Sequence, residues 1–136
     1  MNPKLFKSFF SKFITERVGE IGLTESQIVF LTILDEEKGM SLKGITERIG
    51  VHKSLTTRAI RHLSENGYVL NSSESGKEHS ILLTPKGAEA KELAIQAFNE
   101  LFEFILEDIT DDELEVMERV MSKIKHKIEG SSVKTQ

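Results

Sequence analysis

The chain has 136 residues, no cysteine and a formal net charge of -4. Its length fits one domain with or without an extension, and its composition, 38% hydrophobic and 29% charged, is that of a folded protein. The absence of cysteine excludes disulfide bonds, thiol nucleophiles, thiol redox switches and thiolate metal sites. No apolar run approaches the roughly 18 residues that cross a bilayer, and lysines interrupt the apolar N-terminus, which breaks any signal-peptide core. We therefore expect a cytoplasmic protein without membrane contact.

Charges of opposite sign are segregated along the chain. Residues 1–19 hold four cations and one acid, residues 41–68 hold five cations and two acids, and residues 101–129 hold four cations and nine acids. Overall acidity would normally argue against nucleic acid as a partner. The distribution of charge matters more than its sum, however, and the middle of the chain is basic.

Two helices are predicted in the first forty residues. Apolar residues at helical spacing predict a helix from about Pro3 to Val18, and proline suits a first-turn position. Thr24 and Gln27 have the spacing of a capping box. The nearly continuous apolar run that follows predicts a buried helix that ends near Gly39.

Two shorter helices and a hairpin are predicted next. Ser41 is placed to cap a short helix that Gly50 ends, because glycine accepts the left-handed conformation. After Val51 and His52 the chain resumes as a helix that stops at Gly67. Apolar runs at residues 68–70 and 81–83, separated by a polar segment, predict a β-hairpin with an exposed tip.

The last third of the chain is predicted to be helical. Thr84 and Pro85 begin a helix of about 24 residues, roughly 35 Å long, that reaches about Asp108. Thr110 and Glu113 form a second capping box at the start of a final helix. The tail, residues 130–136, is predicted to be disordered.

Two short helices, a turn and a hairpin are the order of elements in a helix-turn-helix with a wing. On a helical wheel for the second of these helices, the apolar side chains fall within one arc of about 140°. The opposite side carries hydroxyl and guanidinium groups, so we predict that the helix buries one side and offers the other to a major groove. The apolar set is Leu55, Ala59, Ile60 and Leu63, and the polar set is Ser54, Thr57, Arg58 and Arg61.

Eight residues are predicted to contact DNA. Arginine pairs bidentately with guanine, while serine and threonine reach bases or phosphates. The hydroxyl and the cation at the start of the preceding helix are placed to hold phosphates. The alternative is a charged, solvated helix surface, and Thr56, on the buried side, is expected to be structural. The predicted DNA-binding residues are Ser41, Lys43, Lys53, Ser54, Thr57, Arg58, Arg61 and Lys77.

Three stretches of this chain resemble the MarR family of winged helix-turn-helix transcriptional regulators. They read "LTESQIVFLTIL", "KGITERIGVHKSLTTRAIRHLSENGYV" and "ILLTPKGAEA". The family's run of small and hydroxyl residues, then Arg, then Leu-x-x-x-Gly-Tyr matches Ser54 to Tyr68, and its Leu-Thr-x-x-Gly matches Leu83 to Gly87. The resemblance extends over about residues 5–128. It implies a mainly α (α+β) fold, with long N- and C-terminal dimerisation helices and one small β-hairpin wing.

The resemblance also implies a function and a division of the chain. It implies a homodimer that binds a near-palindromic double-stranded operator as a transcriptional regulator, often a repressor released by a small aromatic or amphipathic effector. Residues 1–22 would be the N-terminal dimerisation helix, residues 23–87 the DNA-binding lobe, and residues 88–129 the C-terminal dimerisation helices.

The wing departs from the family pattern. The family usually has an Asp followed by one or two Arg, whereas the tip here reads Ser75-Gly76-Lys77 between Glu74 and Glu78. Lysine is more strongly hydrated than arginine and enters a narrow minor groove less favourably. The sequence therefore leaves two roles open for Lys77: a contact with DNA, or a solvated charge on the loop.

The residues by themselves also favour a dimer. In a monomer, part of the aromatic cluster on the first helix would be exposed to solvent, and an exposed apolar patch of this kind marks an interface. Two-fold pairing would space the recognition helices about 34 Å apart. The alternative is an aromatic core packed within a monomer. The cluster consists of Phe6, Phe9, Phe10 and Phe13.

The sequence also allows a function other than DNA binding. A winged helix whose basic face binds an acidic protein would have the same pattern, and salt-dependent binding to duplex DNA with a sequence preference would separate the two. No Gly-rich phosphate loop or nucleophile elbow indicates an enzyme, and the histidines lack metal spacing, so no cofactor is expected. An effector pocket would use apolar residues of the first, second and fifth helices, with Arg17 or a histidine meeting a carboxylate.

Overall fold

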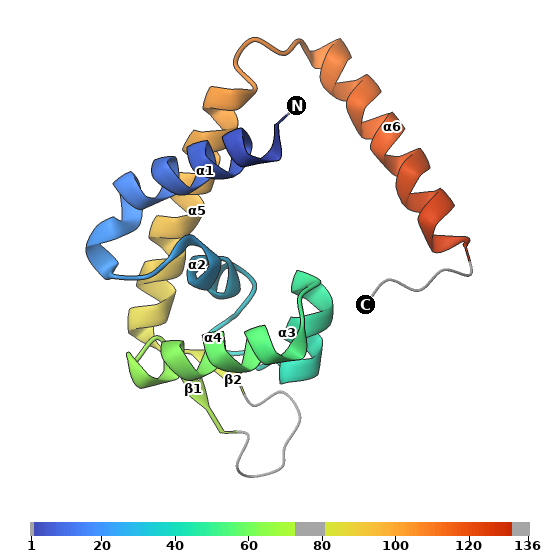
Figure 1. The fold of residues 1–136 in the computed structure, drawn as a ribbon. Coiled ribbons are helices and arrows are strands. Elements are labelled where there is room, and N and C mark those ends of the chain that lie inside the picture. The colour runs from blue at the N-terminus through green and yellow to red at the C-terminus, as the bar shows by residue number, and fades with distance from the viewer. Residues whose placement is uncertain (1, 73–80, 132–136) are drawn as a thin grey trace. The chain divides into compact units, whose positions relative to one another are not determined.

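A computed structural model describes residues 2–72 and 81–131 (Figure 1). The chain divides into two compact units, residues 1–101 and residues 102–136. The helices are α1 (Pro3–Val18), the short 3-10 helix η1 (Gly19–Ile21), α2 (Glu25–Thr32), α3 (Leu42–Ile49), α4 (Lys53–Glu65), α5 (Pro85–Ile105) and α6 (Asp111–Glu129). The strands are β1 (Val69–Asn71) and β2 (Ile81–Leu83). The described part is therefore a mainly α fold with one small antiparallel hairpin, as predicted.

The helix starts follow the predicted caps. The Thr24 hydroxyl accepts from the Gln27 N–H at 3.3 Å, and the Gln27 side chain accepts from the Thr24 N–H at 3.0 Å. Thr110 and Glu113 form the same reciprocal pair at the start of α6. Each pair satisfies two backbone donors that a helix start leaves without a partner, which is why these helices begin where they do.

Helix α2 ends seven residues before its predicted end near Gly39. The carboxylate of Asp35 accepts from the Lys38 N–H at 2.8 Å and the Glu37 N–H at 3.3 Å, which closes a turn in place of another helical turn. The Lys38 hydrogen bond, more than any other contact, lowers the pKa of the Asp35 carboxyl. The helix prediction for residues 33–39 was wrong because this local side-chain capping competes with the helix.

The hairpin lies against α4 and gains a third short segment. β1 and β2 pair antiparallel, with Val69 opposite Leu83 and Asn71 opposite Ile81. Met40 and Ile81 also exchange two backbone hydrogen bonds of 3.0 Å, which joins the residue before the cap of α3 to the base of the hairpin. This bridge was not predicted, because single-residue pairing leaves no periodic pattern in a sequence.

One hydrophobic core joins the helix-turn-helix to the helices around it. Its members come from α1, α2, α3, α4, the hairpin and α5, and they are buried by the packing of several elements on one another. The largest fully buried side chains are Phe30, Ile14, Ile28, Leu31, Leu34, Ile45, Ile60, Leu63, Ile81, Leu101 and Thr56. This core holds the lobe that presents α4.

In residues 102–136, α6 has no buried residue. Its large apolar side chains repeat at three and four positions, and none of them is buried: Val116, Met117, Val120, Met121, Ile124 and Ile128. No helix in the described part of the chain is long and apolar enough to cross a membrane.

Candidate nucleic-acid interface

Helix α3 starts with a capped turn that carries two of the predicted contact residues. The Ser41 hydroxyl accepts from the Gly44 N–H at 2.9 Å, so its first role is to cap the helix. Lys43 is exposed in the same turn. The remaining N–H groups of this turn and the Lys43 ammonium form a surface suited to a phosphate oxygen.

The turn into α4 has the geometry of a helix-turn-helix. Gly50 adopts φ 78° and ψ 35°, the left-handed conformation that glycine reaches without steric cost, and its N–H bonds to the Thr46 carbonyl. The His52 carbonyl then accepts from Leu55 and Thr56, which starts α4 without a side-chain cap. α3 and α4 lie side by side in Figure 1.

The inward side of α4 is buried except at Leu55, which is half-buried. Ile60, Leu63 and Thr56 are 1%, 0% and 0% exposed. The Thr46 hydroxyl donates to the Thr56 hydroxyl oxygen at 2.9 Å and ties α3 to α4. Thr56 is therefore structural, as predicted, and the hydrogen bond satisfies a hydroxyl that would otherwise be costly to bury.

The outward side of α4 carries the predicted contact groups. Lys53, Ser54, Arg58 and Arg61 are exposed, and Thr57 is half-buried with its hydroxyl donating to the Lys53 carbonyl at 3.0 Å. Within residues 2–72 and 81–131, no carboxylate lies within ion-pair distance of either arginine. These guanidinium groups are consequently available to an external acceptor.

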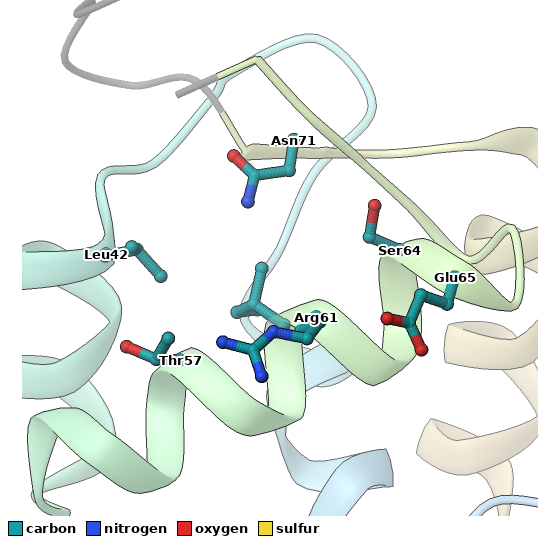
Figure 2. Close-up of a pocket in the computed structure, with 7 residues that line it drawn as sticks. Leu42, Thr57, Arg61, Ser64, Glu65 and Asn71 are labelled. Carbon is teal, nitrogen blue, oxygen red and sulfur yellow. The ribbon is translucent and has the colours of Figure 1, made fainter. Parts of the chain in front are cut away.

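The two arginines border different hollows. A hollow of about 310 Å³ lies between α4, the start of α3 and the end of β1, and Figure 2 shows the Arg61 guanidinium reaching into it between Thr57 and Glu65, with Asn71 opposite. A second hollow, of about 210 Å³, lies between α2 and α4, with Arg58 beside Ser26 and Gln27. The outward side of α4 is thus a ridge with a guanidinium on each flank.

Three polar residues of the first hollow were not predicted as site residues. Ser64 and Glu65 lie three and four positions after Arg61, so helical spacing alone could have placed them on its flank. Asn71 reaches the hollow only because β1 pairs with β2 beside α4, which no local pattern indicates. Lys77, the last predicted contact residue, lies outside the described residues.

The chemistry of this ridge is that of a binding surface. It offers guanidinium, ammonium and hydroxyl donors, with Glu65 as an acceptor at one end. In the described part of the chain, no three histidine, aspartate or glutamate side chains are placed to hold a metal ion. Arginine forks match guanine and phosphate geometry, so the donors suit nucleic acid.

Comparison with known proteins agrees with this geometry. A family model described as the MarR family matches residues 23–75, which contain α2, α3, α4 and β1. No curated protein sequence matches the chain. A solved structure of a MarR protein from Peptoclostridium difficile is 27% identical, covers 93% of this chain and 83% of its own, and has a TM-score of 0.79.

Two further solved structures share the fold at lower identity. The transcriptional regulator SlyA is 20% identical, with 92% of this chain and 89% of that chain covered and a TM-score of 0.79. The S. aureus MepR–DNA complex is 15% identical, with 92% of both chains covered and a TM-score of 0.75. The fold therefore extends well beyond the segment that the family model matches.

Proposed function

We propose that the protein, whose residues 23–75 match the MarR family model, is a sequence-specific double-stranded DNA-binding transcriptional regulator. One observation carries the proposal: Arg58 and Arg61 are exposed on the outward side of α4, opposite the buried Thr56, Ile60 and Leu63. A helix held in this way enters a major groove with its backbone already ordered, so only the exposed side chains lose conformational freedom on binding. A relative of the same fold was solved as a DNA complex.

The protein is proposed to act as a homodimer. The apolar side of α6 has no cover within the described residues 102–131, and such a stripe marks an interface. Residues 111–118 hold five acids and no base, whereas residues 119–129 hold four lysines and arginines and one acid. An antiparallel pair of α6 helices would therefore place opposite charges against each other while it buries both apolar stripes.

Helix α1 supports the same assembly. Phe6 and Phe9 are 50% and 37% exposed, while Phe10 stacks on Phe98 of α5 at 5.7 Å between ring centroids. Part of the predicted aromatic cluster therefore packs within the chain, and part of it is exposed. Two-fold pairing would place two α4 helices about 34 Å apart, one turn of DNA, and would favour a near-palindromic operator.

The protein is further proposed to be a repressor that a small ligand releases. Arg17, the predicted partner of a ligand carboxylate, donates to the Glu100 carboxylate at 2.5 Å and lies 3.4 Å above the Phe13 ring. A carboxylate ligand would have to displace Glu100 from this guanidinium. Thermal-shift titration with aromatic acids tests this: stabilisation supports the proposal, and a flat response counts against that ligand class.

The alternative is a winged-helix module that binds an acidic protein. Both functions would use the same basic ridge, but only a DNA-binding protein shows duplex binding that weakens with salt and depends on base sequence.

Selection of bound duplexes from a random pool tests the proposed function. We expect a near-palindrome whose half-sites are about one helical turn apart. Light scattering on the same sample should give the mass of a dimer at micromolar concentration. A pool that shows no enrichment, with binding that is indifferent to sequence, would refute sequence-specific regulation.

A further inference from the structure

The first turn of α5 holds the end of α4. The Thr84 hydroxyl donates to the Gly67 carbonyl at 2.5 Å, and the Thr84 N–H donates to the Tyr68 carbonyl at 3.1 Å. The Lys86 ammonium donates to the Asn66 carbonyl at 2.8 Å and lies 4.4 Å from the centroid of the Tyr68 ring. Three consecutive residues after α4 are therefore contacted from α5 and its cap.

Gly87 allows the first turn of α5 to lie close to the Tyr68 backbone. A Cβ at Gly87 would lie 1.9 Å from the Tyr68 carbonyl oxygen, so only glycine lets α5 approach the chain this closely. The Tyr68 N–H in turn donates to the Leu63 carbonyl at 2.9 Å, in the last turns of α4. Displacement of α5 at this point would therefore be transmitted to the end of α4.

Lys86 acts on α4 from outside that helix. The Asn66 and Gly67 N–H groups bond back to carbonyls of α4 itself, whereas the Asn66 carbonyl is taken by the Lys86 ammonium. The carbonyl end of a helix carries partial negative charge, which a lysine offsets. The Tyr68 ring beneath the ammonium adds a cation–π contact and restricts its position.

We propose that Lys86, together with Thr84, is a positioning residue that sets the angle between α4 and α5. The inference rests on the proposed function, in which α4 enters the groove and the C-terminal helices pair two chains. In such a dimer the angle between α4 and α5 decides how far apart the two α4 helices lie. Lys86 thereby restricts the half-site spacing that the protein accepts.

Lys91 is a matched control on the same helix. Its ammonium donates to the Leu34 carbonyl at 2.6 Å, at the turn that follows α2. Both lysines thus extend from α5 to a carbonyl after a helix of the lobe, but only Lys86 contacts the end of α4. Removal of either ammonium loses a hydrogen bond to a carbonyl that follows a helix of the lobe, but only Lys86→Met should change the half-site spacing that the protein accepts.

The test uses the full chain and a duplex that the wild type selects from a random pool. Affinity is measured by fluorescence anisotropy on this duplex and on versions with one base pair inserted or removed at its centre, a change that rotates the half-sites by about 34°. For the wild type, Lys91→Met and Lys86→Arg, we expect each change to weaken binding roughly tenfold or more. For Lys86→Met we expect a penalty of about threefold or less, at a melting temperature close to that of Lys91→Met.

The other outcomes overturn either the role of Lys86 or the proposed function. Equal spacing penalties in the wild type and in Lys86→Met, or equal relaxation in Lys91→Met, would overturn the inference and leave Lys86 as a stabilising contact only. If Lys86→Met is too unstable to assay, Thr84→Val removes the second side-chain contact to the same turn. We expect this variant to have a smaller spacing penalty than the wild type, and an unchanged penalty would overturn the inference. A wild type that selects no duplex would instead refute the proposed function itself.

Discussion

Helices α4 and α6 have the same kind of amphipathic pattern and opposite surroundings. The apolar side of α4 is buried in its own lobe, with Leu63 and Ile60 at 0% and 1% exposed, while its polar side carries two exposed arginines. The apolar side of α6 has no cover within its own unit, among the described residues 102–131. Both helices carry an apolar stripe, but the two stripes pack against different partners. The stripe of α4 packs against its own chain, whereas we expect the stripe of α6 to pack against a second copy of the chain.

The largest expected effect comes from the buried side of α4. Leu63→Ala should lower the free energy of unfolding by about 2–5 kcal/mol, because the deleted methyl groups leave a cavity in a closed core. Chemical denaturation measures it, and the loss should not depend on protein concentration. Leu70→Ala, at a leucine of β1 that is 58% exposed, is the control. A loss of under about 1 kcal/mol at Leu63 would contradict the core assignment.

The apolar side of α6 should respond differently. Val120→Asp should raise the dissociation constant of the proposed dimer roughly a hundredfold, because it would place a carboxylate where the proposed partner helix packs. Analytical ultracentrifugation over a concentration series measures the change. Ser122→Asp adds the same charge on the polar side of α6 and should leave the dimer intact. If both variants behave as the wild type, α6 is not the dimer interface.

The outward side of α4 should affect binding without affecting stability. Arg58→Ala and Arg61→Ala should each weaken operator binding by about 1–3 kcal/mol where the guanidinium contacts a base. The melting temperature should hardly change, because both side chains are exposed. Lys7→Ala/Lys12→Ala removes two cations from α1 as a control for net charge. Wild-type titration curves from the double arginine variant would falsify the assignment of α4 as the reading helix.

A smaller effect is expected at the joint between α3 and α4. Thr56→Val removes the acceptor of the Thr46 hydroxyl and should cost about 1 kcal/mol. The cost is modest because the Thr46 hydroxyl also lies 2.7 Å from the Leu42 carbonyl, to which it can still donate. Thr56→Ser keeps the hydroxyl and should retain most of the stability. Equal denaturation midpoints for the valine and wild-type chains would show that this hydrogen bond contributes nothing net.

The smallest effect concerns pH and the start of α6. Hydrogen bonds from the backbone N–H and then the side chain of Thr110 lower the pKa of the Glu113 carboxyl. A lowered pKa in the folded state means that the stabilisation is complete above the ordinary glutamate pKa and is lost as pH falls through the lowered value. Helicity followed by circular dichroism should therefore decline slightly on acidification. Glu113→Gln should lose this component, and an unchanged pH profile in that variant would assign the decline to other carboxylates.

Much of the secondary structure could be predicted because its signals are local. The caps at Thr24, Ser41 and Thr110 and the left-handed Gly50 depend on residues within one helical turn of each other, and all four were confirmed. The end of α2 was missed because the Asp35 side chain competes with the helix for backbone donors. The division into residues 1–22, 23–87 and 88–129 stays a prediction, since it describes an assembly of two chains.

By itself the sequence determined which side of α4 is apolar and which is cationic, because both sets repeat with the helical period and need no knowledge of distant residues. Only the tertiary structure decided what lies beside them. Asn71 next to Arg61, the bridge from Met40 to Ile81, and the contact of Lys86 with the end of α4 join residues that are between 10 and 41 positions apart. Such pairings depend on how the core closes, and a local pattern carries no record of that.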